Sequence, residues 1–120
     1  MTSANEDVVD LDSHLPLGPR DFQVLMLVFQ EPMHGYGIAK ASTTDSAGRS
    51  VLDLGSLYRI IGRLMKAGLL EDVTQAQHDS NRQRRYYRAT ELGRRVARAE
   101  AARLRELLES EHAGLLWQEP

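Results

Sequence analysis

The amino-acid sequence predicts a mainly α-helical fold with a small β-hairpin, followed by a long C-terminal helix. Three observations support this fold class. Residues 56–67 carry one apolar stripe at helical spacing. Residues 69–75 and 84–89 have the composition of two short strands, and a polar turn separates them. Residues 91–117 repeat apolar side chains at helical spacing over more than five turns' worth of sequence.

The composition is that of one globular domain. The 120 residues are 42% hydrophobic and 27% charged, which suffices for one core and argues against global disorder. We expect a flexible acidic tail over residues 1–15, a compact domain over residues 16–90 and a single helix over residues 91–117. Cysteine is absent, which excludes disulfides and thiolate metal sites. The longest apolar run, residues 24–29, is too short to cross a membrane, so we expect a cytoplasmic protein.

Charge is distributed unevenly along the chain. The net charge is −2, which by itself does not favour a nucleic-acid partner. Residues 49–98, however, hold 11 Lys/Arg against 5 Asp/Glu, a local charge of +6, whereas the rest of the chain holds 4 against 12, a charge of −8. A basic block within an acidic protein is typical of a phosphate-binding face, although solvated arginine-rich helices would give the same count.

The first helix is predicted to begin at Pro19, which suits the first helical position, with Asp21 in the first turn where the helix dipole favours an acid. Residues 22–29 are apolar nearly all round, so both sides of this helix need cover. In so small a protein, a second subunit would supply part of it. A second helix follows Pro32, and we expect His34 to cap or pack its start.

The helix over residues 56–67 is the best-defined element. Its apolar stripe is Leu57, Ile60, Ile61 and Leu64, and Gly68 ends it as a left-handed cap. The opposite surface presents only uncharged or basic residues. We expect a minor strand over residues 51–54, just before this helix.

The terminal helix has Thr90 as a good N-cap and a broad apolar seam that it cannot bury against itself. Pairing with a second chain would cover that seam. We expect the dimer interface to include Phe22, Met26, Phe29, Val96, Leu104, Leu107, Leu108 and Leu115.

The order of elements matches a helix-turn-helix followed by a β-hairpin wing. In that arrangement the third helix enters the major groove, and the wing follows the DNA backbone or minor groove. Closely spaced arginines at the hairpin suit the release of counterions from phosphates. The residues we expect to contact DNA are Tyr36, Ser56, Tyr58, Arg59, Arg63, Lys66, Arg82, Arg84 and Arg85.

Several short blocks, in this order, resemble those of PadR-like regulators. They are Leu17-Gly18, Pro32-Met33-His34-Gly35-Tyr36, Gly55-Ser56-Leu57-Tyr58, Arg63-Leu64, Gly68-Leu69 and the run from Arg84 to Gly93. The resemblance covers residues 15–109. The sequence departs from the family pattern at four positions: Gly37 and Met65 replace common acids, Arg59 replaces a usual proline, and Ala89 replaces a common leucine.

The resemblance implies a winged-helix repressor of the short type, with one C-terminal dimerisation helix. Such proteins are homodimers that pair through their first and last helices and bind palindromic operators in double-stranded DNA. Many release DNA when a small aromatic effector binds. Met26, Met33 and Trp117 are candidates for an effector pocket, because an aromatic ring can stack on a ligand and methionines adapt to it. The alternative is that Trp117 fastens the last helix to the domain.

Enzymatic and metal functions are not indicated. The four histidines, His14, His34, His78 and His112, lack the spacing of metal ligands, and no nucleophile–base pair or phosphate loop is evident. We therefore expect no cofactor. Two other functions stay open: a winged-helix module that uses the basic wing to bind an acidic protein, and a sensor whose main event is binding a small molecule.

Overall fold

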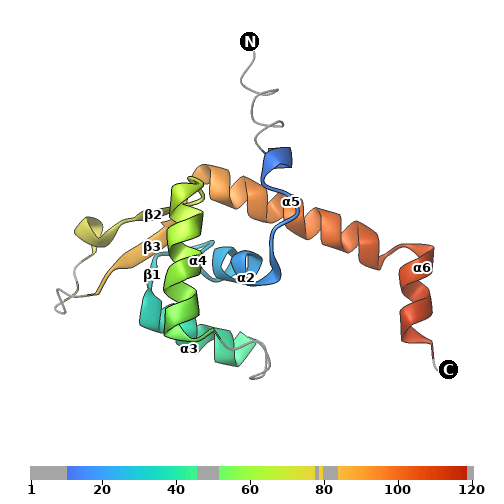
Figure 1. Cartoon of the computed structure of the whole chain (residues 1–120), viewed down its shortest axis with the longest axis horizontal. Helices are drawn as coiled ribbons and strands as arrows, with labels where there is room; N and C mark the ends of the chain where they lie inside the picture. The colour runs from blue at the N-terminus through green and yellow to red at the C-terminus, as the bar shows by residue number, and fades with distance from the viewer. Residues whose placement is uncertain (1–10, 46–51, 78, 80–83, 119–120) are drawn as a thin grey trace, which may run out of the picture.

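The computed structural model describes residues 11–45, 52–77, 79 and 84–118. Figure 1 shows helices packed with a small sheet into a body, from which the C-terminal helices project. The elements are α2 (Pro19–Leu27), β1 (Met33–His34), α3 (Gly35–Asp45), α4 (Leu54–Lys66), β2 (Leu70–Asp72), the short 3-10 helix η1 (Thr74–Ala76), β3 (Tyr86–Ala89), α5 (Glu91–Leu108), α6 (Glu111–Gly114) and η2 (Leu115–Trp117). In the described part of the chain, no helix is long and apolar enough to cross a membrane.

The core lies between α2, α3, α4, the sheet and the first half of α5. The predicted stripe of α4 is confirmed, because all four of its members are buried. Leu11, Leu15 and Leu17 also pack against this core and are partly buried. The last residues of the expected flexible tail are therefore attached to the domain. Residues 1–10 lie outside the described residues, so the tail stays a prediction there.

Helix α4 begins two residues earlier than expected. Asp53 has extended backbone geometry, and its side chain accepts a hydrogen bond from the backbone N–H of Ser56. Asp53 is thus the N-cap, and Leu54 opens the helix instead of ending a strand. The expected minor strand is wrong at residues 52–54, and Val51 lies outside the described residues. At the other end, Gly68 has φ +79°, which confirms the left-handed C-terminal cap.

The sheet is antiparallel, with strand order β1-β3-β2. β3 pairs with β2 in the expected hairpin, in a register that places Leu70 opposite Ala89. Both strands are shorter than expected. β2 gives way to η1 because the carboxylate of Asp72 accepts a hydrogen bond from the backbone N–H of Thr74 and turns the chain. On its other edge β3 pairs with β1, a strand that the sequence reasoning missed.

Thr90 caps α5 as predicted, with its hydroxyl accepting from the backbone N–H of Gly93 and donating to the carbonyl of Gly68. This brings the first turn of α5 so close to the end of α4 that a Cβ on Gly93 would overlap the carbonyl oxygen of Leu69. The start of α5 is therefore fixed against β2 by backbone contact. Only glycine fits at position 93.

The terminal helix is not continuous to residue 117. α5 ends at Leu108, and the hydroxyl of Ser110 accepts from the backbone N–H of Ala113 to cap the separate helix α6. The expectation of one helix over residues 91–117 is wrong, because this cap starts a second helix in a new direction. Figure 1 shows α6 turning away from the axis of α5 at the far end of the molecule.

Candidate nucleic-acid interface

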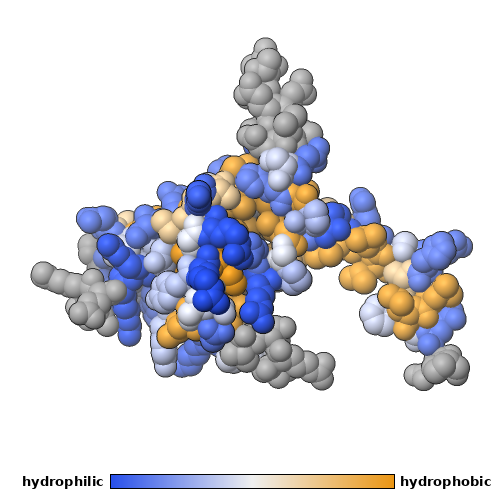
Figure 2. All heavy atoms as spheres, in the orientation of Figure 1, coloured by the Kyte–Doolittle hydropathy of each residue, from blue (hydrophilic) through white to orange (hydrophobic). Residues whose placement is uncertain are grey.

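The exposed face of α4 carries two basic side chains and two glycines. With about 100° between successive residues of a helix, its centre is occupied by Gly55, Arg59, Gly62 and Lys66, opposite the buried stripe. A Cβ on Gly62 would meet nothing within 4 Å. Figure 2 shows hydrophilic side chains along the length of α4 in this view. The helix thus presents basic side chains beside an exposed stretch of backbone.

The first turn of α4 is held by a short chain of hydrogen bonds. The carboxylate of Asp53 accepts from the backbone N–H and from the hydroxyl of Ser56, both at 2.9 Å. These hydrogen bonds hold the pKa of the Asp53 carboxyl below its usual value, and the one from the Ser56 backbone N–H has the larger effect. The Ser56 hydroxyl also accepts from Nη2 of Arg59 at 3.2 Å. Ser56 therefore stabilises the helix and orients Arg59; its contact with DNA stays a prediction.

Arg63 lies on the flank of this face, on the side of α2. Its Nε and Nη2 donate to the two carboxylate oxygens of Asp21, at 3.1 and 2.6 Å. The Arg63 side chain remains 59% exposed, whereas that of Asp21 is 16% exposed. Asp21 occupies the first turn of α2 as predicted, but no pattern in the sequence indicates a partner 42 residues away. The two hydrogen bonds to Asp21 therefore set the orientation of the Arg63 side chain.

The opposite flank of α4 carries Tyr58, which packs against the start of α3. A Cβ on Gly35 would lie 2.5 Å from the Tyr58 hydroxyl, so the tyrosine occupies the space that a side chain there would need. Tyr58 is nevertheless 49% exposed, and Tyr36 of α3 is 65% exposed. Both keep enough free surface for the predicted DNA contacts, which stay predictions.

His34 joins the start of α3 to the sheet. Its Nδ1 accepts from the backbone N–H of Gly37 at 2.9 Å, and its ring meets Tyr86 edge-on with 5.3 Å between centroids. The expectation that His34 caps or packs the second helix is confirmed. Because β1 also pairs with β3, the helix-turn-helix and the wing are connected at this residue.

The wing arginines are each placed near a carboxylate. Arg84 lies 3.6 Å from Asp79, Arg85 lies 3.9 Å from Asp72, and Arg88 lies 3.2 Å from Glu71. All three arginines stay about half exposed, so these ion pairs are weak and screened. The wing therefore offers cations that a phosphate can reach, with less net charge than the sequence suggests. Arg82 lies outside the described residues.

The two tyrosines of β3 point to opposite sides of the strand, because successive side chains of a strand alternate. Tyr87 is buried in the core, and burial raises its pKa. Tyr86 is half-buried and donates its hydroxyl hydrogen to Asp79 at 2.5 Å, a hydrogen bond that raises the pKa of Tyr86. Asp79 thus joins Tyr86 to Arg84 at the base of the wing.

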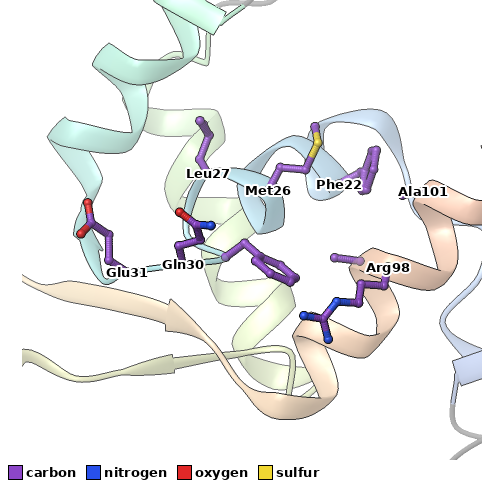
Figure 3. A pocket seen from close by; sticks show the side chains of 9 residues that line it. Phe22, Met26, Leu27, Gln30, Glu31, Arg98 and Ala101 are labelled. Carbon is purple, nitrogen blue, oxygen red and sulfur yellow. The ribbon is translucent and has the colours of Figure 1, made fainter.

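A groove of about 390 Å³ separates α2 from α5. Figure 3 shows Phe22 and Met26 of α2 on one side and Arg98 and Ala101 of α5 on the other. Phe29 also lines it, with the guanidinium groups of Arg94 and Arg98 over its ring at 5.4 and 4.9 Å from the centroid. Both guanidinium groups therefore contact the Phe29 ring through cation–π interactions, and Arg98 remains exposed to solvent.

Most residues assigned to the dimer interface are accessible. Met26 is 47% exposed, and Leu107, Leu108 and Leu115 are 54, 56 and 59% exposed, while Phe22, Phe29 and Leu104 are partly buried. Val96 is the exception: it is fully buried within the single chain, so its assignment to an interface between chains is wrong. Leu116 and Trp117, both 72% exposed, belong to the same apolar surface. Neither of these two residues is among those that the sequence assigned to the interface.

The expected effector residues are not brought together. Met26 lines the groove, but Met33 lies in β1 and Trp117 in η2, at the far end of the molecule, and neither lines it. A pocket formed by these three residues at an interface between two copies stays a prediction. Trp117 does not fasten the last helix to the domain either, since most of its surface is exposed. Among the described residues, no group of three His, Asp or Glu could hold a metal ion.

A recognition helix with a basic exposed face, joined to a β-hairpin that carries arginines, defines the winged helix-turn-helix class of DNA-binding proteins. Residues 24–99 match the family described as the transcriptional regulator PadR-like family. Because the match covers more than half of the chain, the protein belongs to that family. It is therefore a DNA-binding transcriptional regulator, not an enzyme.

Solved structures agree with this assignment. A PadR family transcriptional regulator from Eggerthella lenta DSM 2243 is 27% identical, with a TM-score of 0.65, over 99% of this chain and 100% of that one. A PadR-like regulator from Bacillus cereus strain ATCC 14579 is 20% identical, with a TM-score of 0.67, over 83% and 93%. One from Clostridium difficile R20291 is 19% identical, with a TM-score of 0.67, over 82% and 99%. The last two show a shared fold alone. No curated protein matches the chain.

Proposed function

We propose that this regulator is a homodimeric repressor that binds a palindromic operator, with α4 of each copy in the major groove. The observation that carries the proposal is the exposed face of α4, where Arg59 and Lys66 flank the bare backbone of Gly62. Arginine and lysine are the side chains best suited to guanine edges, and glycine permits close approach to DNA. A protein that occupies an operator in this way hinders transcription from it. A regulator of this kind acts where the DNA is, which supports the cytoplasmic location expected from the sequence.

The wing is assigned to the phosphate backbone. Arg84 and Arg85 are exposed and lie beside carboxylates at 3.6 and 3.9 Å, distances at which the pairing is loose. A phosphate can take the place of these carboxylates with little loss, because exposed ion pairs contribute at most about 1 kcal/mol. Such contacts position the protein without reading sequence.

The dimer is supported by the apolar surface at the C-terminal end. Leu107 and Leu108 at the end of α5, with Leu116 and Trp117 in η2, are each more than half exposed. Figure 2 shows this apolar surface on the projecting α5–α6 arm. A contiguous exposed apolar surface on a soluble protein marks an interaction site. We assign it, together with the groove between α2 and α5, to a second copy of the chain. A small aromatic effector would then bind at that groove, where Met26 is exposed.

DNA binding is tested by selecting bound sequences from a random DNA pool, followed by salt-titrated binding measurements. We expect a palindromic site with half-sites about 10 base pairs apart. Arg59→Ala should weaken binding to this site more than binding to random DNA, whereas Arg84→Ala should weaken both equally and make the salt dependence shallower. Arg105→Ala, a cation removed from the exposed end of α5, is the control. Failure to select any sequence would contradict the proposal and favour an acidic protein as the partner of the wing.

The dimer is tested by sedimentation equilibrium. Leu116→Glu places a charge in the exposed apolar surface without touching the core, and it should convert dimers to monomers. Glu106→Gln, an exposed neighbour on α5, is the control and should leave the dimer intact. A wild-type protein that sediments as a monomer would contradict the proposal.

The effector is tested with a panel of aromatic compounds by thermal shift of the wild type and of Met26→Ala. If no compound stabilises the wild type, the proposed effector site is contradicted.

A further inference from the structure

The ion pair between Asp21 and Arg63 lies at the edge of the surface assigned to DNA. It joins the first turn of α2 to the last turn of α4, and these two helices pack against each other. Asp21 uses both oxygens, on Nε and on Nη2 of Arg63, at 3.1 and 2.6 Å. This side-on geometry holds the planar guanidinium in one orientation. An arginine with a single hydrogen bond would keep rotating about its terminal torsions.

The pairing leaves the outer part of the guanidinium available. An arginine has five N–H donors, and the two hydrogen bonds to Asp21 occupy two of them. The Arg63 side chain stays 59% exposed while Asp21 is 16% exposed, so the carboxylate lies inside and the arginine outside. The remaining donors, on Nη1 and Nη2, are not used by Asp21, and the side chain that carries them is more than half exposed. Two of them in one plane are what a guanine edge requires.

Resting on the proposed function, we propose that Asp21 is a positioning residue: it holds Arg63 in the orientation in which α4 reads one base pair of the operator. Asp21 does not touch DNA in this assignment. It acts through Arg63, by restricting the side chain before binding and by compensating its charge. Arg63 is thereby distinguished from Arg59 and Lys66, which lie at the centre of the exposed face and have no carboxylate among their hydrogen-bond partners in the described structure.

A positioning role of Asp21 can be distinguished from repulsion between its carboxylate and the DNA phosphates. An acid close to DNA repels phosphates, so replacing Asp21 by asparagine should strengthen binding to any DNA if repulsion were its only effect. Removal of a positioning residue has the opposite effect on specific DNA. Arg63 must then be immobilised at the moment of binding, which costs affinity for the operator alone. The two effects have opposite signs on the selected site.

The experiment compares wild type, Asp21→Asn, Arg63→Ala and the double variant on the selected site and on random DNA. With Asp21→Asn, we expect operator affinity to fall about three- to tenfold, the size of the cost of ordering one long side chain. Affinity for random DNA should stay the same or rise. Repeating the selection with Asp21→Asn should give a site that has lost preference at one base pair. In the Arg63→Ala background, Asp21→Asn should cause no further loss of operator affinity.

Asp21→Glu and Glu106→Gln are the matched controls. The first keeps a carboxylate and should recover part of the operator affinity, and the second removes one acid from the exposed end of α5 and should change neither affinity. An unchanged or raised operator affinity with Asp21→Asn would overturn the proposal, as would a parallel loss on both DNAs. The Arg63 Nε–Hε resonance supplies a test without DNA: it should be rigid in wild type and mobile in Asp21→Asn. If the Arg63 Nε–Hε group is rigid in both wild type and Asp21→Asn, the proposal is overturned. This result needs no DNA, so it is independent of whether an operator can be selected.

Discussion

Glu100 is a buried acid on α5, and its replacement by glutamine should destabilise the protein. The side chain is 2% exposed. One carboxylate oxygen accepts from the backbone N–H of Leu17 at 3.3 Å and from Nε of Arg103 at 2.9 Å, and the other accepts from Nη2 of Arg103 at 2.6 Å. Glutamine keeps the shape and one acceptor but turns an N–H₂ group towards a guanidinium donor. The short contact at 2.6 Å becomes repulsive.

The size of the effect follows from these contacts. A hydrogen bond to a charged group contributes about 1.5–3 kcal/mol, and breaking a buried ion pair costs about 3–5 kcal/mol. Arg103 is 36% exposed, so water can replace part of what it loses. We therefore expect Glu100→Gln to lower the free energy of unfolding by about 2 kcal/mol at neutral pH, near the low end of these ranges. The measurement is urea unfolding at fixed protein concentration, because a dimer's stability depends on it.

The same residue should impose a pH dependence. The hydrogen bonds from Arg103, followed by that from Leu17, hold the pKa of Glu100 below its ordinary value. A lowered pKa in the folded state stabilises the protein above the ordinary pKa of the unfolded chain, and this stabilisation is lost as the pH falls through the lowered value. The difference between wild type and Glu100→Gln should therefore shrink on acidification. Glu106→Gln, an exposed acid on the same helix, should match wild type throughout. A difference that is absent at neutral pH, or that stays constant into acid, would refute the reasoning.

Three further substitutions test local features of the fold. Gly93→Ala should cost about 3 kcal/mol in urea unfolding because its Cβ overlaps the carbonyl of Leu69; an unchanged midpoint would show that α5 can shift without loss. Gly62→Ala should instead stabilise α4 by about 0.5–1 kcal/mol, since its Cβ meets nothing, while weakening operator binding; unweakened binding would remove the close approach of α4 to DNA. His34→Ala should cost about 1 kcal/mol of thermal stability by removing the acceptor for the Gly37 N–H, and His34→Asn should recover part of it; equal losses in both variants would exclude a capping role.

Features that depend on nearby residues were predictable from the sequence. The stripe of α4 repeats within four turns, so its burial follows from helical periodicity alone. The caps at Gly68 and Thr90 each depend on a backbone group within a few residues of the helix end. The same stripe also predicted which side of α4 is exposed, because that side lies opposite the buried face; its contact with DNA stays a prediction. These features require no knowledge of the tertiary structure.

Features that depend on residues distant in sequence were not predictable. The two residues of β1 are a strand only because β3 lies beside them, and Met33 and Tyr87 pair across more than fifty positions. Nothing near Asp21 in the sequence indicates Arg63. The end of α5 was missed for another reason: the apolar seam resumes at Leu115, so periodicity continues across a break that Ser110 creates through a single capping hydrogen bond. Glu100 interrupts no pattern, yet it is the most buried acid of the described chain.

Helix α2 connects the two surfaces of the protein. Its first turn holds Asp21 against Arg63 of the recognition helix, and the next residue, Phe22, lines the groove assigned to the second copy. Asp21 and Phe22 are adjacent in α2 but contact different partners. Any rotation or translation of α2 at the groove would therefore also move the Asp21 carboxylate relative to Arg63. A bidentate ion pair tolerates little displacement, because both hydrogen bonds require the two planar groups to stay aligned. A displacement of α2 at the groove would therefore also displace the carboxylate that holds Arg63, because both side chains belong to the same nine-residue helix.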